Sequence, residues 1–217
     1  MRGVKLVIFD LDGTLIDAYA AIIESFNYTM RKLDYPLQSA RAIRRAVGWG
    51  DALLLKPFVK PKELKAALDI YRSHHEVSLL KYSRLLPGTK PVLRYLKAKK
   101  LKIAVASNRP TRFSLILINH LKLKKYFDYV LCADKLKRGK PDPSILKGIM
   151  SKFRARPVET VYVGDMAIDA QAGRRGGVRT VIVSGGSSTL AEIRKEKPWR
   201  IVRKQADLLK LFKGRLG

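Results

Sequence analysis

Short apolar runs that end in small or polar residues recur along much of the chain. The first, Val4 to Phe9, is mostly β-branched and carries no charge after Lys5. Such a run is typical of a strand that is buried on both faces of a sheet. The same pattern predicts four further strands, at residues 102–106, 129–131, 160–163 and 179–183.

Helical spacing of apolar residues separates these runs. It predicts helices at residues 90–99, 112–121, 143–153, 167–174 and 189–195. Alternation of strands and helices is typical of an α/β protein with a parallel sheet. We therefore predict a Rossmann-like core in which helices cover a parallel sheet.

The stretch from residue 17 to residue 86 departs from this alternation. Its apolar residues follow helical spacing, as at Ile22, Phe26 and Met30, and it contains no convincing strand. A Pro-Gly pair at residues 87–88 then breaks the helical pattern. These features predict an inserted α-helical domain, residues 17–86, and a core domain made of residues 1–16 and 87–217.

Composition excludes several classes of protein. The 217 residues are 47% hydrophobic and 29% charged, which is enough apolar material for a buried core and differs from a disordered chain. The single cysteine, Cys132, excludes an intramolecular disulfide and a thiolate metal site, and it favours a reducing compartment. Because no run reaches the roughly 18 apolar residues of a membrane span, we expect a soluble, cytoplasmic protein with no membrane partner.

The net charge of +27 is the unusual feature of the composition. Most of the basic excess lies after residue 86, and such a field attracts polyanions. Runs such as residues 97–102 contain no interleaved aromatic residues that could stack on bases. We therefore attribute the charge to a lysine-rich proteome, and nucleic-acid binding is the less favoured alternative.

Polar residues follow the predicted strands at the points where the strands end. Ligands of open parallel sheets bind at the carboxyl ends of the strands, where loops from several strands meet. The residues in question are Asp10, Asp12 and Thr14 after the first strand, Ser107 and Asn108 after the second, Lys140 in a Gly-Lys-Pro turn, and Asp165 and Asp169 after a later strand. We expect these side chains to form one site.

Four carboxylates at one edge of a sheet repel one another unless a cation lies among them. Oxygen ligands of this kind favour a hard divalent ion, so we predict a Mg²⁺ site. The hydroxyl, amide and lysine around the carboxylates suit a group with several anionic oxygens, and phosphate is the obvious candidate. Gly13 would let the backbone approach that ligand and offer an amide donor.

The order of these motifs resembles that of the haloacid-dehalogenase-like (HAD) superfamily of phosphohydrolases. Four segments carry the resemblance, residues 10–15 (DLDGTL), 107–108 (SN), 140–143 (KPDP) and 164–169 (GDMAID). The helical insertion lies where the phosphoglycolate-phosphatase-like members of that family carry a helical cap domain. The resemblance therefore implies a HAD-type core with a cap at residues 17–86.

The resemblance also implies catalytic roles. Asp10 matches the nucleophile that forms an aspartyl-phosphate, and Asp12 matches the general acid that protonates the leaving alcohol and then activates water. Lys140 matches the cation that neutralises Asp10 and the transferring group. Because a halide leaving group needs no proton, the acid at Asp12 argues against dehalogenation.

Metal and phosphate ligands follow from the same comparison. Mg²⁺ would be held by the Asp10 carboxylate, the Asp12 backbone carbonyl and Asp165. Asp169 would reach the metal through water or orient its ligands. The expected phosphate-binding groups are Gly13, Thr14, Ser107, Asn108 and the backbone that follows them.

Substrate selection is expected from the cap. The segment at residues 47–52 places Trp49 between two glycines, which suits a loop that presents an indole to the substrate, although a junction within the cap core would read the same way. The three histidines, His74, His75 and His120, lack metal-ligand spacing and are expected at the surface or partly buried.

The sequence thus predicts a Mg²⁺-dependent phosphatase of a small phosphorylated metabolite, with phosphoglycolate as the family's nearest example. Hydrolysis of pyrophosphate and a phosphomutase reaction use the same core and remain alternatives. A phosphatase or binding protein that acts on nucleic acid is a third. The protein would be a monomer or a homodimer.

Overall fold

The computed structural model describes residues 3–214. The predicted core domain also includes residues 1–2 and 215–217, which lie outside the described residues. The core contains one parallel sheet of order β5-β4-β1-β6-β7-β8. Its strands are β1 (Leu6–Phe9), β4 (Lys102–Ser107), β5 (Tyr129–Cys132), β6 (Thr160–Gly164), β7 (Arg179–Val183) and β8 (Arg200–Val202).

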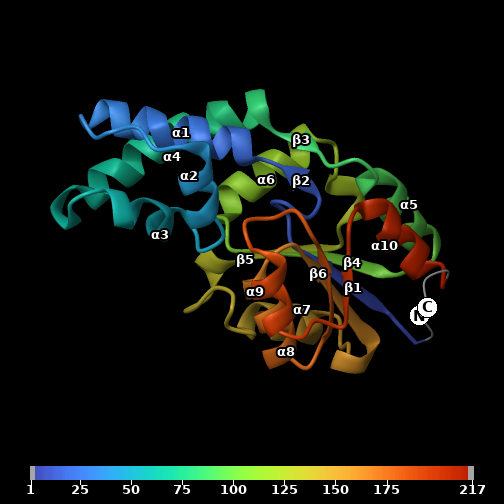
Figure 1. Ribbon diagram of the computed structural model, residues 1–217. Helices are drawn as coiled ribbons and strands as arrows, with labels where there is room; N and C mark the ends of the chain where they lie inside the picture. Colours follow the sequence, from blue (N-terminus) through green and yellow to red (C-terminus); the bar gives the residue numbers. More distant parts are fainter. Residues whose placement is uncertain (1–2, 215–217) are drawn as a thin grey trace.

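Helices cover both faces of the sheet, as Figure 1 shows. The helices of the core are α5 (Thr89–Ala98), α6 (Thr111–His120), α7 (Ser144–Lys152), α8 (Ala167–Arg175), α9 (Leu190–Lys195) and α10 (Gln205–Phe212). Helices α5, α6 and α10 share one hydrophobic cluster with the sheet, whereas α7 and α8 share the other. This three-layer arrangement, with similar solved structures reported below, confirms the predicted α/β fold.

The two clusters follow from the alternation of side chains along each strand. In β1, Val7 and Phe9 face the cluster of α5, α6 and α10, whereas Leu6 and Ile8 face the cluster of α7 and α8. All four side chains are fully buried. A strand in this position needs apolar residues at every place, which explains the unbroken apolar run in the sequence.

The segment between residues 17 and 86 is built of helices joined by short loops. It contains α1 (Tyr19–Lys32), α2 (Ala40–Ala46), α3 (Asp51–Leu55) and α4 (Leu64–Tyr82), with short 3₁₀ turns at Lys56–Phe58 and Pro61–Glu63. These helices have a hydrophobic cluster of their own, which includes Phe26, Ile43 and Tyr71. In Figure 1 they form a separate layer beyond the sheet edge that carries the polar residues. We call this helical segment the cap.

Two very short strands join the cap to the core, where the sequence had shown no convincing strand. They are β2 (Ile16–Asp17) and β3 (Arg84–Leu85), which pair antiparallel. The ion pair between Arg84 and Asp17 lies in this ribbon, with 2.9 Å between its closest atoms. Two residues per strand are too few to give a periodic signal in the sequence.

The last strand and the last helix were also not predicted. Strand β8 has only three residues, and basic residues stand at its start and directly after it. Helix α10 has eight residues and buries Leu208, Leu211 and Phe212 against the sheet. At its start, the Gln205 side chain donates a hydrogen bond to the Thr14 carbonyl at 2.8 Å. The α10 region therefore supports the polar loop after β1.

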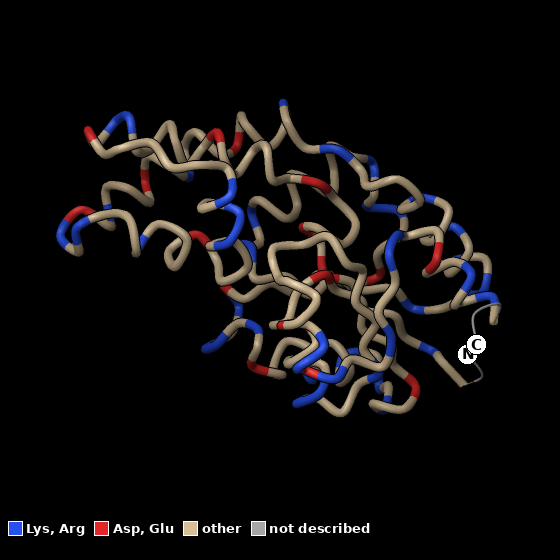
Figure 2. The backbone as a smooth tube through the Cα atoms, in the orientation of Figure 1, with Lys and Arg blue, Asp and Glu red and all other residues tan. Residues whose placement is uncertain are grey.

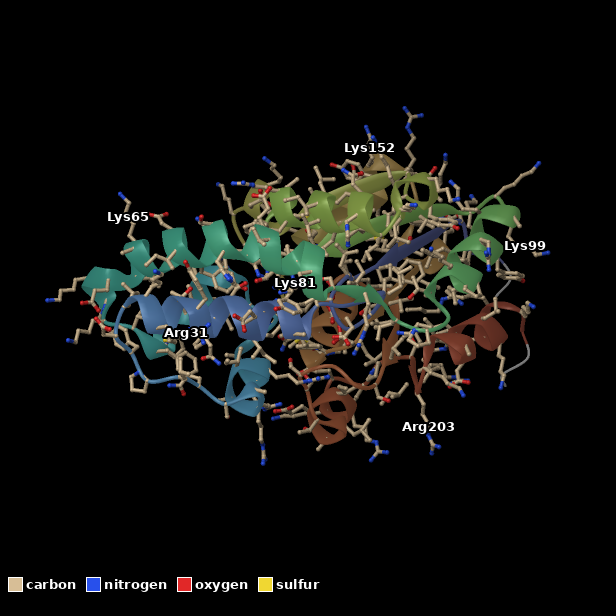
Figure 3. All side chains as sticks on the ribbon, turned by 90° about the horizontal axis from the view of Figure 1, so that it is seen from above. Arg31, Lys65, Lys81, Lys99, Lys152 and Arg203 are labelled. Atoms are coloured by element: carbon tan, nitrogen blue, oxygen red, sulfur yellow. The ribbon has the colours of Figure 1, made fainter. Side chains whose placement is uncertain are left out.

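Basic residues are dispersed over the molecule. Figure 2 shows Lys and Arg on the elements of both cap and core, and the labelled side chains in Figure 3 come from both parts. Among residues 3–214, no helix is both long enough and apolar enough to cross a membrane.

Candidate active site

Sheet register brings the predicted polar residues together. Phe9, the last residue of β1, pairs with Val105 of β4 and with Val163 of β6. Asp10 follows β1 and Asp165 follows β6. Because the two strands are parallel neighbours, both residues lie at the carboxyl end of the sheet. Thr14 confirms the proximity, because its hydroxyl donates to Asp165 Oδ1 at 3.0 Å although the two are 151 residues apart.

Lys140 lies at the centre of a buried polar network. Its Nζ donates to Asp10 Oδ1 at 2.7 Å, to Asp169 Oδ1 at 2.8 Å and to the Tyr162 hydroxyl at 3.0 Å. Tyr162 in turn donates to Asp169 Oδ1 at 2.6 Å. A lysine has three donors, so every donor of Lys140 is used and its position is fixed. Tyr162, a polar tip in the middle of the apolar strand β6, was missed by the sequence analysis.

Asp169 acts on the site through its neighbours. Its Oδ1 accepts from Lys140 and Tyr162, and its Oδ2 accepts from the backbone amides of Asp165 and Met166 at 3.2 and 3.0 Å. These bonds orient Lys140 and the turn after β6. They are compatible with the expected orienting role, and a contact of Asp169 with the metal through water stays a prediction.

One lysine does not balance the charge of the buried carboxyl groups. Burial raises the pKa of Asp10 to about 7, because desolvation and the charges of Asp169 and Asp12 outweigh the attraction of Lys140. Burial and the same crowding raise the pKa of Asp165 well above its usual range. For Lys140, burial opposes the charge, but Asp10 and Asp169 outweigh it and raise the pKa. Three carboxylates face one lysine, which leaves two negative charges for a divalent cation to balance.

The residues fit such a cation. Oxygens of Asp10, Asp165 and Asp169 lie within 4.8 Å of one another. Asp165 Oδ2 is buried and, among residues 3–214, accepts no hydrogen bond. A buried acceptor without a partner is costly, and a bound cation removes that cost. An all-oxygen donor set suits Mg²⁺, and Asp10 and Asp165 have the free oxygen atoms to hold it.

Gly13 and Thr14 have roles that differ from the predicted phosphate contacts. The Gly13 amide donates to the Ile16 carbonyl at 2.8 Å, so it is engaged within the loop. A Cβ at Gly13, where φ is +76°, would lie 2.1 Å from Asp165 Oδ2. Gly13 therefore makes room for Asp165, and Thr14, which is fully buried, holds that carboxylate by its hydroxyl.

Ser107 and Asn108 lie where they were expected. The Ser107 hydroxyl still has a proton to donate, whereas the Asn108 side-chain amide is already bonded to the backbone. Ser107 lines the cavity described below and accepts from the Arg109 amide at 3.2 Å. The Asn108 amide donates to the carbonyls of Gly48 and Lys140 at 2.8 and 2.9 Å and accepts from the Lys140 amide at 2.7 Å. Asn108 thus joins the Lys140 loop to the cap, and its side chain does not reach out to a phosphate.

Asp12 is held by an arginine that the sequence analysis did not single out. Arg109 Nε and Nη2 donate to the two Asp12 oxygens at 2.8 and 2.9 Å, and Nη1 donates to His75 Nε2 of the cap at 2.7 Å. The position of Arg109, directly after the Ser-Asn pair, was the available signal. The expectation for His75 was wrong, because it is only 1% exposed and lies at the site. Helix α4 brings it there, which local spacing could not reveal.

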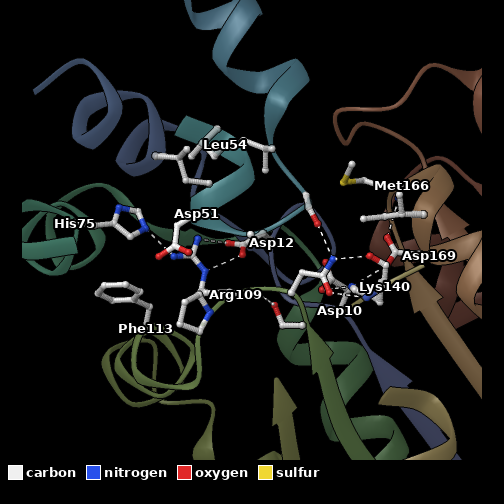
Figure 4. A pocket seen from close by; sticks show the side chains of 18 of the residues that line it. Asp10, Asp12, Asp51, Leu54, His75, Arg109, Phe113, Lys140, Met166 and Asp169 are labelled. Atoms are coloured by element: carbon white, nitrogen blue, oxygen red, sulfur yellow. Dashed lines mark hydrogen bonds and ion pairs between the residues drawn. The ribbon is translucent and has the colours of Figure 1, made fainter. Parts of the chain in front are cut away.

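A cavity of about 70 Å³ lies between cap and core. Figure 4 shows Asp10, Lys140 and Asp169 at one end and Arg109 and His75 at the other. The cap contributes mainly backbone and apolar groups to its wall, including Gly48, Gly50 and Leu54. Trp49 is not among the lining residues, and its side chain is 45% exposed. The loop thus meets the cavity through its glycines, and the structure does not bring the indole to the site.

Two arginines of α2 fasten the cap to the core loop after β7. Arg44 donates to the Gly185 carbonyl and lies 3.9 Å from the Tyr19 ring centroid. Arg45 donates to the Ser187 carbonyl and forms a two-bond ion pair with Glu192. These contacts hold the cap against the core next to the site.

Comparisons with known proteins agree with this geometry. A family model described as haloacid dehalogenase-like hydrolase matches residues 7–183. A phosphoglycolate phosphatase from Pseudomonas putida is 28% identical over 211 residues, which cover 91% of this chain and 76% of that protein. A candidate pyrophosphatase, PpaX, from Caldanaerobacter subterraneus subsp. tengcongensis is 31% identical over 212 residues, or 97% of this chain and 96% of the relative. The crystal structure of a predicted phosphoglycolate phosphatase from Haemophilus somnus superposes with a TM-score of 0.91 at 27% identity and covers 98% of this chain and 99% of that one.

Proposed function

Because this chain belongs to the haloacid dehalogenase-like hydrolases and is a phosphatase of that family, we propose that it hydrolyses a small phosphate monoester, such as phosphoglycolate, with Mg²⁺. The observation that carries the proposal is the contact of Lys140 with Asp10 at the carboxyl edge of the sheet. It fixes a buried carboxylate beside a cation at the cavity wall. A transferring phosphoryl group needs such an arrangement of nucleophile and positive charge.

Two displacements account for the reaction. An Asp10 oxygen attacks phosphorus, the bond from phosphorus to the ester oxygen breaks, and that oxygen takes a proton from Asp12. Asp12 then takes a proton from water, whose oxygen attacks the aspartyl-phosphate and releases phosphate and the Asp10 carboxylate. Both Asp12 oxygens accept from Arg109, so Asp12 must leave that arginine and enter the first step as the protonated acid, the form that its uptake of a proton from water restores.

The chain's own groups prepare the phosphoryl end. Lys140 holds Asp10 and places positive charge where the equatorial oxygens gather negative charge. Asp10 and Asp165, with the Asp12 carbonyl, would hold Mg²⁺, which when bound supplies further charge neutralisation. The Ser107 hydroxyl can donate to a phosphate oxygen at the same end of the cavity.

The size of the cavity favours a small substrate. A volume of about 70 Å³ corresponds to roughly five water molecules, which suits an ester of few atoms better than a nucleotide. We expect a small phosphorylated metabolite as the partner and the cytoplasm as the place of action.

Pyrophosphate is the second candidate substrate. The 31% identity to a candidate pyrophosphatase over nearly the whole of both chains favours it. Pyrophosphate is small enough for the cavity and differs from a phosphoglycolate-type ester only in its leaving group. Relative rates of phosphate release on the two compounds discriminate between them.

Phosphate release from a panel of small esters and pyrophosphate tests the proposal. Wild type should release phosphate from at least one of them only with Mg²⁺, and Asp10→Asn should lose this activity by at least about 1,000-fold because the amide is a poor nucleophile. Asp69→Asn, an exposed change on α4, is the matched control. Full activity in Asp10→Asn would refute the nucleophile assignment, and an isomerised product without free phosphate would indicate a mutase.

A further inference from the structure

Arg109 is a buried charge at the end of the cavity away from Lys140. It is only 8% exposed, although an arginine is seldom buried without a function or a full set of partners. Figure 4 shows it between the cap residue His75 and Asp12, with Phe113 alongside. Arg109 and Lys140 are the two cationic side chains among the described residues that line the cavity.

Of the partners of Arg109, only Asp12 balances its positive charge. Arginine only donates, so the contact with His75 requires Nε2 of that ring to be the acceptor and Nδ1 to carry the proton. The Nδ1 atom lies 2.9 Å from the Ser25 hydroxyl, which can accept this proton. Burial first, and then the charge of Arg109, lower the pKa of His75 to about 2, so the ring is neutral. The histidine orients the guanidinium without balancing its charge.

The cap holds His75 firmly in this position. The ring stacks on Tyr71, with centroids 4.7 Å apart, and meets the edge of Phe113 at 5.2 Å. Tyr71 belongs to the cap and Phe113 to α6 of the core, so the ring is fixed when the two parts are in contact. The guanidinium is therefore aimed into the cavity by residues from both sides.

Asp12 shows what the guanidinium fork can bind. Its carboxylate is held by two parallel N–H bonds, the geometry in which arginine prefers carboxylate and phosphate oxygens. The proposed reaction requires Asp12 to turn to the leaving-group oxygen. Once it does so, the buried guanidinium must find another anion or carry an uncompensated charge.

We propose that Arg109 is a specificity-determining residue that binds a second anionic group, a carboxylate or phosphoryl group, on the leaving-group side of the substrate. This inference rests on the proposed phosphatase function and narrows its substrate class to small esters with two anionic ends. Lys140 and Asp10 hold the phosphoryl end, and Arg109 holds the other. In the absence of substrate, Asp12 accepts the two hydrogen bonds of the guanidinium, and the second anionic group of the substrate would take them over.

The test compares two esters that differ only in the second charge. Phosphoglycolate ends in a carboxylate, whereas 2-hydroxyethyl phosphate has a neutral hydroxymethyl group in its place. In wild type, we expect kcat/KM to favour phosphoglycolate by about 100-fold, the value of a charge-assisted pair of hydrogen bonds. In Arg109→Met, this ratio should fall to within a few-fold of one, with most of the loss on phosphoglycolate.

Matched variants separate recognition from folding. Arg112→Met removes an exposed arginine that pairs with Glu76 of α4, and it should keep the wild-type ratio. Arg109→Lys keeps the charge but loses the fork, so its ratio should fall by about tenfold. This variant decides the question if Arg109→Met does not fold. His75→Leu should lower the ratio as well, and His75→Gln, whose amide oxygen can accept from Arg109, should restore it.

Two results would overturn the inference and leave the phosphatase assignment standing. One is a wild-type ratio near one with Asp10-dependent phosphate release from both esters. The other is an equal loss on both esters in Arg109→Met and Arg109→Lys, which would make Arg109 a positioning residue for Asp12. The absence of Asp10-dependent phosphate release from every small ester would instead contradict the proposed function itself.

Discussion

The two ends of the cavity are built in different ways. At the phosphoryl end, Asp10, Lys140 and Asp169 all belong to the core. They come from the end of β1, the loop before α7 and helix α8, and Lys140 bonds to both carboxylates. At the other end, Arg109 of the core depends on His75 of the cap. Asn108 links the Lys140 loop to Gly48, so one cap contact also supports the phosphoryl end. The comparison indicates that the charged side chains of the phosphoryl end are held by core residues, whereas the guanidinium at the other end is held directly by a side chain of the cap.

The two ends also differ in charge. Three buried carboxyl groups share one lysine at the phosphoryl end, and burial with this crowding raises the pKa of Asp10 and of Asp165, so that a cation is needed to keep them ionised. At the other end, one buried guanidinium is paired with Asp12 beside a neutral imidazole and aromatic rings, and Asp51 of the cap also lines the cavity. A cation and a phosphoryl group therefore complete the first end, whereas the proposed second anion would take the place of Asp12 at the other.

Apart from loss of the nucleophile, the largest effect is expected at Lys140. Lys140→Met removes the charge beside Asp10 together with its bonds to Asp169 and Tyr162. We expect kcat to fall by at least about 100-fold, as when one preorganised donor to a transition state is lost. Lys137→Met, an exposed lysine of the same loop, should keep kcat. A loss of only a few-fold, with the variant folded by circular dichroism, would mean that the metal alone carries the charge at this end.

The phosphoryl end could be predicted from the sequence because its geometry follows from local patterns. Strands were visible as apolar runs, and parallel strands align their carboxyl ends, so Asp10, Ser107 and Asp165 had to meet. The family model and the similar phosphatases confirm the resemblance that the four motifs indicated. What the sequence could not give is how each polar atom is used, and the Gly13 amide and the Asn108 side chain are the examples.

The cap end could not be predicted, since nothing local specifies it. His75 reads as one polar position on a long helix, and only the docking of α4 against α6 places it next to Arg109. Trp49 shows the opposite error, because an aromatic residue between glycines looked like a substrate contact and is half exposed. Contacts between two separately packed parts depend on their relative position, which periodicity and spacing do not encode.

The next effect concerns metal and pH at the phosphoryl end. Unfolded carboxyl groups ionise near pH 4, whereas the folded metal-free protein keeps Asp10 protonated up to about pH 7. Since the folded state then binds more protons, the free energy of unfolding should fall as pH rises from about 4 to 7. Mg²⁺ should remove this decline, because it favours the ionised carboxylates. Thermal denaturation against pH, with and without Mg²⁺, measures both.

Asp165→Asn sharpens this test. The variant removes a buried carboxylate whose Oδ2 accepts no hydrogen bond among the described residues. Without metal, its melting temperature at neutral pH should exceed that of wild type by several degrees. Mg²⁺ should raise the melting temperature of the variant much less than that of wild type. Asp69→Asn on the exposed face of α4 should behave as wild type. An equal Mg²⁺ response in Asp165→Asn would show that Asp165 does not hold the metal.

The smallest effect is expected where α2 fastens the cap to the core. Arg45 bonds to the Ser187 carbonyl and to Glu192, but its side chain is half exposed, so water and salt screen the ion pair. Arg45→Ala should raise KM about two- to fivefold, leave kcat nearly unchanged and lose most of this effect at high salt. Arg41→Ala, on the exposed face of the same helix, is the control. A large fall in kcat would mean that cap contact governs the phosphoryl end as well, which would break the distinction between the two ends of the cavity.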